Sequence, residues 1–138
     1  MKTVILLLKL IITIIVGQTL IFKFSGAEES VYVFSALGIE PWGRLALGTM
    51  ELVSILLLWI PKTTYYALML ILGIMSGAIA SHLFVLGIVI KADKGELFIL
   101  GLVTWVSTAA ILIIKSEEVK TTAIKLFDKK RVLQSDNK

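Results

Sequence analysis

Four long apolar runs constrain the fold of this chain more than any other feature. They cover residues 3–22, 42–60, 65–90 and 97–114. Each has about the 17–25 residues that a helix needs to cross the hydrocarbon core of a bilayer. The chain has only 138 residues, 57% of them hydrophobic, and a domain of this size cannot bury so much apolar surface in one water-soluble core. We therefore predict an all-α fold, a four-transmembrane-helix bundle that has the lipid bilayer as its solvent.

The composition excludes several classes of site. The sequence has no cysteine, which rules out disulfides, thiol nucleophiles and cysteine-ligated clusters within the chain. Its single histidine rules out a multi-histidine metal site or bis-histidine haem ligation within one chain, and we expect no metal. There is no glycine-rich phosphate loop, and the basic C-terminal residues lack interleaved aromatics. We therefore expect no nucleic-acid partner.

Basic residues are distributed unevenly between the two sides of the four runs. Nine lysines and arginines lie on the side that holds both termini and four lie on the other, with Lys9 inside the first run. The positive-inside rule then predicts a multi-pass protein of a bacterial-type plasma membrane with both termini in the cytoplasm. The alternative for the first run is a cleaved signal peptide, but its apolar stretch is about 20 residues long against the usual 7–15.

The connections between the runs carry helix signals. Ser25 and Glu28 match a capping box, and apolar residues behind them recur at helical spacing, which predicts a short amphipathic helix over residues 26–37 on the outer membrane surface. The alternative is a strand at the β-prone residues 31–34. Pro61 is expected to end the second span, Thr63 to cap the third, and the Asp93 to Glu96 segment to open the fourth as a second capping box.

The sequence divides into a four-helix membrane domain, residues 1–114, and a basic cytoplasmic tail, residues 115–138. The tail is predicted to be a fraying extension of the fourth helix near anionic headgroups, or else a solvated segment needed only for topology.

Polar side chains inside the spans are the candidate site. At a rise of about 1.5 Å per residue, Glu51 lies about 13 Å and His82 about 12 Å from the outer end of their spans. The second and third spans are joined by a tight turn, so we predict that these two side chains meet, directly or through one water, with Gln18 and Thr104 in support. Such a pair either binds a polar ligand or moves protons, or only fixes the register of the helices. Lys9 is about 9 Å from the start of its span and is expected to snorkel to the headgroups.

A stripe of small residues marks the third span. Gly73, Gly77 and Ser81 are four residues apart, a spacing that permits close helix approach. We expect this stripe to pack against a neighbouring helix. On that basis Gly77→Leu is expected to damage folding more than Gly87→Leu.

Three stretches of the chain resemble the DoxX-like membrane proteins. They are LIFKFSG at residues 20–26, LGTMEL at 47–52 and GAIASHL at 77–83. The usual pattern places the first-span lysine after a glycine, whereas Lys23 precedes Ser25 and Gly26. The resemblance covers nearly the whole chain before the tail and implies a four-helix membrane bundle, in a family often of unknown function with members linked to a thiosulfate:quinone oxidoreductase.

These observations leave three functions open. The resemblance favours a membrane protein of undefined biochemistry that serves as a subunit of a quinone-linked redox complex, with a quinone as cofactor and other membrane redox subunits as partners. The second function is a small-molecule transporter or ligand-binding membrane protein whose polar centre is Glu51 and His82. The third is a membrane scaffold in which the same polar cluster is purely structural. The sequence does not determine whether the protein is an enzyme.

Overall fold

The computed structural model describes residues 1–135 of the chain. Its elements in order are α1 (Lys2–Ser25), α2 (Glu28–Ala36), α3 (Trp42–Trp59), α4 (Thr64–Ser81), the π-helical turn η1 (His82–Leu86) and α5 (Glu96–Ser135). The described residues contain helices and no strand, so the strand alternative for residues 31–34 is wrong. Four helical segments are long and apolar enough to cross a membrane, which confirms the all-α prediction and its four candidate spans.

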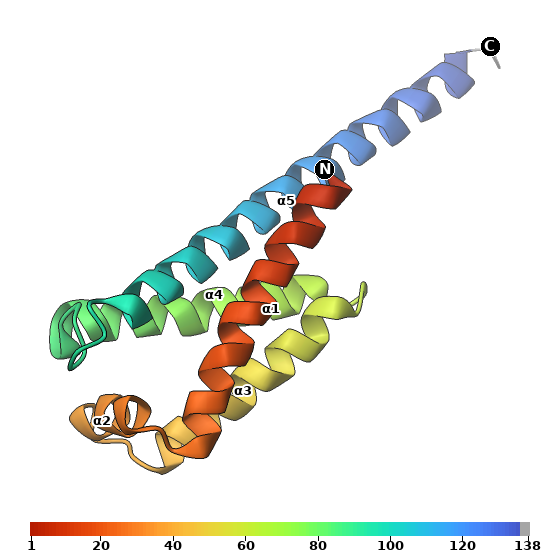
Figure 1. Cartoon of the computed structure of the whole chain (residues 1–138). Helices are drawn as coiled ribbons and strands as arrows, with labels where there is room; N and C mark the ends of the chain where they lie inside the picture. The colour runs from red at the N-terminus through yellow and green to blue at the C-terminus, as the bar shows by residue number, and fades with distance from the viewer. Residues whose placement is uncertain (136–138) are drawn as a thin grey trace.

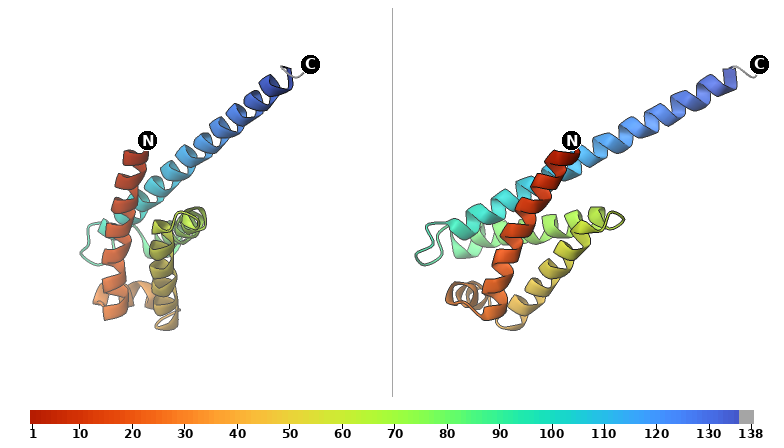
Figure 2. Two further views of the ribbon diagram at one scale, coloured as in Figure 1. Left: turned by 90° about the vertical axis from the view of Figure 1, so that its right-hand side faces the viewer. Right: turned by 45° about the vertical axis from the view of Figure 1, so that its right-hand side comes forward.

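The four long helices form a ring in which each contacts two neighbours. α1 packs against α3 and α5, and α4 packs against the same two helices. We call the end that holds the α3–α4 turn the turn end, and the opposite end the α2 end. The pair α1 and α3 diverges from the pair α4 and α5 towards the α2 end (Figures 1 and 2). The short helix α2 contacts α1, α3 and η1 at that end.

The first helix ends at a glycine rather than at a capping box. Gly26 adopts a left-handed conformation (φ 68°), and the N–H of Ala27 bonds to the carbonyl of Phe22 at 3.1 Å, a Schellman arrangement. Ser25 is therefore the last residue of α1, and its hydroxyl donates to Phe22 O. The predicted Ser25 capping box is wrong, because Ala27 precedes α2 and no side chain caps that helix.

The α3–α4 turn agrees with its sequence signals in part. α3 ends at Trp59, before Pro61, as predicted. Thr63 is at the N-cap position of α4, but its hydroxyl donates to Leu57 O and Ile60 O at the end of α3 instead of capping α4. The predicted Thr63 side-chain cap is therefore wrong. The last carbonyls of a helix lack intrahelical partners, and this hydroxyl gives such a partner to the end of α3. As a result, it does not cap the first N–H groups of α4.

The start of α5 is fixed by an aspartate, but not through the predicted capping box, because the helix begins at Glu96 itself rather than directly after Asp93. The carboxylate of Asp93 accepts hydrogen bonds from the backbone N–H groups of Ile90, Gly95 and Leu97 at 2.8, 2.9 and 3.3 Å. The bond from Leu97 satisfies one of the free N–H groups in the first turn of α5.

Two spans differ in length from the apolar runs that predict them. The run at 65–90 is not one α-helix, because α4 ends at Ser81, continues as the π-turn and leaves helical geometry at Gly87 (φ 81°, ψ 169°). In contrast, α5 continues through the expected boundary between residues 114 and 115 and reaches Ser135 without a break. Residues 136–138 of the predicted tail lie outside the described residues.

The hydrophobic core lies towards the turn end. Its largest fully enclosed side chains come from all four long helices: Ile12, Leu58, Leu68, Ile71 and Ile111, each 0–1% exposed. Many other large apolar side chains, among them Ile14, Leu56 and Phe84, face outwards. Such an apolar surface is typical of a bundle in lipid, since water-soluble monomers rarely expose large contiguous apolar patches.

Candidate functional site

A cavity of about 950 Å³ occupies the α2 end of the bundle. All four long helices line it, together with α2, η1 and the segment between η1 and α5. Its walls are mainly apolar and include three methionines, Met50, Met69 and Met75. Methionine is unbranched and adapts its shape, so such walls suit a ligand of variable outline.

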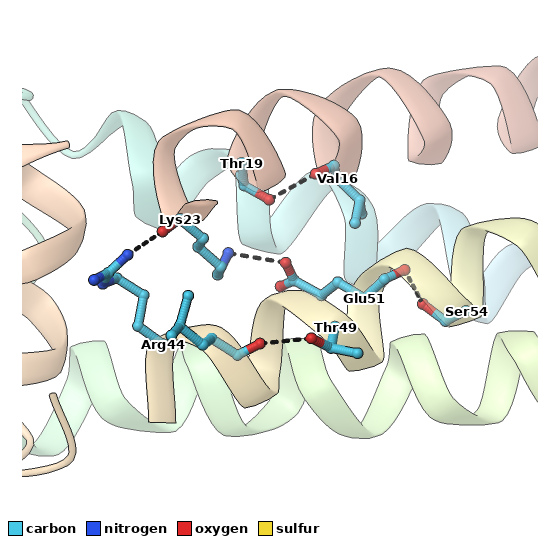
Figure 3. A network of polar contacts seen from close by, with 8 residues as sticks. Val16, Thr19, Lys23, Arg44, Thr49, Glu51 and Ser54 are labelled. Carbon is cyan, nitrogen blue, oxygen red and sulfur yellow. Dashed lines mark hydrogen bonds and ion pairs between the residues drawn. The ribbon is translucent and has the colours of Figure 1, made fainter. Parts of the chain in front are cut away.

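An ion pair between Lys23 and Glu51 crosses one wall of this cavity (Figure 3). Lys23 Nζ, near the end of α1, lies 2.9 Å from Glu51 Oε2 in α3, and the two side chains are 12% and 3% exposed. That oxygen accepts no well-directed hydrogen bond, so the charge of Lys23 is its main compensation. A buried carboxylate without a cation beside it is very costly, which makes Lys23 essential to the arrangement.

Arg44 and Gly48 bring Lys23 and Glu51 together. Arg44 Nε donates to both carboxylate oxygens of Glu40, at 2.8 and 3.0 Å, and Arg44 also donates to the backbone carbonyl of Lys23 (Figure 3). Gly48 lies one turn before Glu51, and a Cβ there would meet the ring of Phe24 at 3.3 Å. The glycine therefore allows α1 to approach α3 closely at the level of the ion pair.

His82 lines the same cavity from η1 but does not meet Glu51. Its Nδ1 lies 2.8 Å from the carbonyl oxygen of Gly87, and its ring packs edge-on against Phe98 with 5.7 Å between centroids. The predicted direct contact with Glu51 is wrong, whereas a shared position in the bundle interior is confirmed. The predicted depths alone did not bring the two groups together, because α3 and α4 diverge from their turn (Figure 1).

Of the two residues predicted to support the polar pair, Gln18 and Thr104, only one lines the cavity. Gln18 lines the cavity from α1. Thr104 is fully buried, but its hydroxyl donates to Leu100 O within α5 and the residue is not part of the cavity wall. The structure therefore brings Gln18 to the site and leaves Thr104 out of it.

The small-residue stripe lines the cavity instead of packing against a helix. Gly73, Gly77 and Ser81 all belong to the cavity wall. A Cβ added at Gly73 or Gly77 would meet nothing within 4 Å, so the predicted helix-packing role is wrong for both glycines. Small side chains at these positions create open space because no neighbouring helix moves in to fill it.

Lys9 has a structural role at the turn end that its sequence position did not reveal. Its ammonium donates to Leu58 O at 2.9 Å and to the Thr64 hydroxyl at 3.4 Å, and it lies 5.8 Å from the centre of the Trp59 ring. These contacts draw the ammonium towards the turn end of the bundle, and its snorkelling to the headgroups stays a prediction. Lys9 satisfies a carbonyl in the last turn of α3, where intrahelical partners run out.

Charged residues surround the cavity at its α2 end. Lys91 pairs with Glu28 of α2 and lies 5.5 Å from the centre of the Tyr32 ring. The hydrogen bond and the positive charge of Lys91 lower the pKa of Glu28. Burial acts to raise the pKa of Asp93, but the backbone hydrogen bonds from Gly95, Ile90 and Leu97 outweigh it and lower this pKa overall.

Lys23 is the site residue that sequence reasoning missed. The lysine was visible in the first of the three DoxX-like stretches, and Glu51 in the second, but both were interpreted separately.

Within residues 1–135, no three histidine, aspartate or glutamate side chains are grouped closely enough to hold a metal ion. The chain matches no protein-family model, no curated protein and no solved structure.

Proposed function

We propose that this protein binds a small amphipathic molecule within the membrane, in the cavity at the α2 end of its bundle. The observation that carries this proposal is the cavity of about 950 Å³ beside the buried Lys23–Glu51 pair. Sites for small ligands are typically apolar clefts of roughly 300–1,000 Å³ with a few polar groups that orient the ligand. Apolar walls, one ion pair and one histidine fit that description.

The cavity argues against a purely structural role for the polar groups. In a scaffold, a buried ion pair is surrounded by packed side chains that exclude other molecules. Here Gly73 and Gly77 leave free space on the wall formed by α4, and His82 presents its ring to that space. Retained function of the protein after joint replacement of Glu51 and His82 would instead support the scaffold, in which these polar groups are purely structural.

A variant that fills the cavity tests the proposal. Gly77→Leu adds a side chain where nothing lies within 4 Å, on the cavity wall. Gly17→Leu is the matched control, because a Cβ at Gly17 also meets nothing within 4 Å but the residue is not part of that wall. We expect Gly77→Leu to weaken binding of a fluorescent long-chain alcohol in nanodiscs by about tenfold or more, and Gly17→Leu to change it by less than about twofold. Equal effects of the two variants would refute the site.

The orientation of the protein decides which compartment the cavity faces. We infer from the excess of basic residues at the turn end that both termini are cytoplasmic and that the cavity lies in the outer half of a bacterial-type plasma membrane. In this orientation α2 is an amphipathic helix at the outer surface, with Phe34 buried and Glu28 exposed. Reporter fusions after Lys62 and Lys138 should read cytoplasmic, and fusions near Glu29 and Lys94 external. An external C-terminus would contradict this orientation.

A quinone-linked redox subunit is the second candidate. What favours it is that Lys23, Glu51 and His82, which come from the three DoxX-like stretches, all line the cavity. A bound quinone would carry the electrons, since the chain has no cysteine of its own for redox chemistry. Lys23 would donate to an oxygen of the quinone, and His82 would accept a hydrogen bond from a hydroxyl of the reduced quinol. A quinone that co-purifies and is lost in Gly77→Leu would support this candidate, whereas solute flux abolished by Glu51→Gln would favour a transporter.

A further inference from the structure

His82 lines the cavity and has one ring nitrogen without a hydrogen-bond partner among the described residues. It is the only histidine in the sequence, it is 7% exposed, and it is the first residue of the π-turn η1. Isolated π-turns within helices are rare and occur frequently at functional sites.

The contact with Gly87 fixes the tautomer of the ring. Nδ1 lies 2.8 Å from the carbonyl oxygen of Gly87, and a carbonyl oxygen only accepts hydrogen bonds. Nδ1 must therefore carry the hydrogen, and in the neutral imidazole Nε2 then has a lone pair and acts only as an acceptor. Within residues 1–135, no group donates a hydrogen bond to Nε2.

The surroundings of the ring hold Nε2 in place. Gly87 adopts φ 81° and ψ 169°, a conformation open essentially to glycine alone, and this geometry accompanies its carbonyl contact with Nδ1. Phe98 packs against the ring at 67° between planes. With Nδ1 occupied, Nε2 is the one polar atom that His82 can offer to the cavity it lines.

We propose that the ligand carries an uncharged hydroxyl group, of the alcohol or phenol class, which donates a hydrogen bond to Nε2 of His82. This inference rests on the proposed function and names the ligand class for the same cavity. A hydroxyl also accepts, and Lys23 on the α1 wall is the donor available to it or to a neighbouring oxygen of the ligand. A carboxylate or a fully ionised phosphate has no hydrogen to give to Nε2, and either group would bring a second negative charge near the buried Glu51.

Two variants of His82 separate its two nitrogens. In His82→Asn the side-chain amide can still donate to Gly87 O from about the position of Nδ1, but nothing occupies the position of Nε2. In His82→Gln the amide extends to about the position of Nε2 and can still accept. The first variant therefore preserves the structural bond and removes the proposed recognition atom, and the second serves as the conservative replacement.

The binding experiment compares a long-chain alkylphenol with its methyl ether, which has the same shape but no donor. Both compete against a fluorescent long-chain alcohol on the full chain in nanodiscs. We expect the wild type to prefer the phenol by about 3- to 10-fold beyond its lipid partitioning, the effect of one hydrogen bond. Because all variants are measured in the same lipid, partitioning cancels in the comparison. His82→Asn should abolish the extra preference, and His82→Gln should retain part of it.

A measurement on the unmodified protein keeps the inference testable if a variant does not fold. The chain has one histidine, so ¹⁵N-labelled histidine gives the ring nitrogens of His82 alone. Addition of the phenol should shift the Nε2 resonance, and addition of the ether should not. An Nε2 resonance that does not respond to the phenol while the phenol is bound, or an unchanged preference in His82→Asn, would overturn the inference. Failure of the wild type to bind any of the three probes would instead overturn the proposed function.

Discussion

The turn end and the α2 end of this bundle are built from the same four helices but are packed in opposite ways. At the turn end, side chains such as Leu58 and Ile71 are completely enclosed, and Lys9 ties α1 to the end of α3. At the α2 end the helices line a partly open cavity of about 950 Å³ with an ion pair in its wall. The difference follows from the connections, since residues 60–63 join α3 and α4 directly, whereas the α2 end holds a helix and a nine-residue segment, 87–95, between spans. Short connections force neighbours together, and longer ones let them separate.

The largest effect is expected from removal of one charge at the α2 end. Lys23→Met leaves Glu51 buried without a cation, and breaking a buried pair in this way costs about 3–5 kcal/mol of unfolding free energy. The double variant Lys23→Met with Glu51→Gln should recover most of that loss, because no uncompensated charge remains. Unfolding in mixed detergent micelles measures both variants.

The exposed pair at the rim is the control for this prediction. Lys91→Met breaks a contact with Glu28, whose side chain is 83% exposed, so little stability should be lost. If Lys23→Met were as mild as Lys91→Met, the interior of the α2 end would be as well hydrated as its surface.

Truncation of an apolar side chain should matter far more at the turn end than at the α2 end. Leu58 is 0% exposed in the core, and Leu58→Ala should lower the free energy of unfolding by about 2–4 kcal/mol through lost contacts and a new void. Met50 borders space that already exists, so Met50→Ala should cost less than about 1 kcal/mol. The same micelle unfolding assay compares them, and similar losses would mean that both ends are equally packed.

Two glycines sharpen the comparison within one span. Gly87 adopts a conformation that strains any other residue, so Gly87→Ala should destabilise by about 1–3 kcal/mol. Gly77 is helical with open space around its Cα, and Gly77→Ala should be neutral or stabilise by up to about 1 kcal/mol through helix propensity. Melting temperatures in detergent decide the order, which is the reverse of the one that the small-residue stripe predicts. A greater loss at Gly77 would show that another helix packs against the stripe.

The smallest expected effect is a pH dependence at the α2 end. Backbone hydrogen bonds lower the pKa of Asp93 in the folded protein, despite partial burial, so its ionised form stabilises the fold above its ordinary pKa of about 3.9. This contribution should be lost as the pH falls from about 5 towards 2, because the unfolded chain takes up the proton first. Melting curves over this range should fall more steeply for the wild type than for Asp93→Asn. Both are measured with Glu28→Gln in the background, since the lowered pKa of Glu28 acts in the same direction.

The axial layout of the bundle could be predicted from the sequence, but the lateral arrangement could not. The lengths of the apolar runs predict the spans, because hydropathy acts locally along the chain. Pro61 predicts the end of the second span and Asp93 the start of the fourth for the same reason. The predicted contact of Glu51 with His82 was wrong, since such a contact depends on how far α3 and α4 separate beyond their turn. The predicted helix-packing role of Gly73 and Gly77 was wrong for the same reason, because small residues permit close packing without specifying a neighbour. Lys23 was missed because a lysine at a span end is ordinarily expected at the headgroups.

Cysteine labelling along α4 tests the contrast between a packed end and a hollow end most directly. The chain has no cysteine, so Gly77→Cys and Ala67→Cys each introduce a unique thiol, one on the cavity wall and one in the core at 0% exposure. With a small maleimide supplied from both sides of the bilayer, we expect Gly77→Cys to react at least about tenfold faster, since reaction requires an accessible thiolate. The fluorescent long-chain alcohol should slow labelling at residue 77 alone. Equal rates at the two positions, with no protection, would contradict the account.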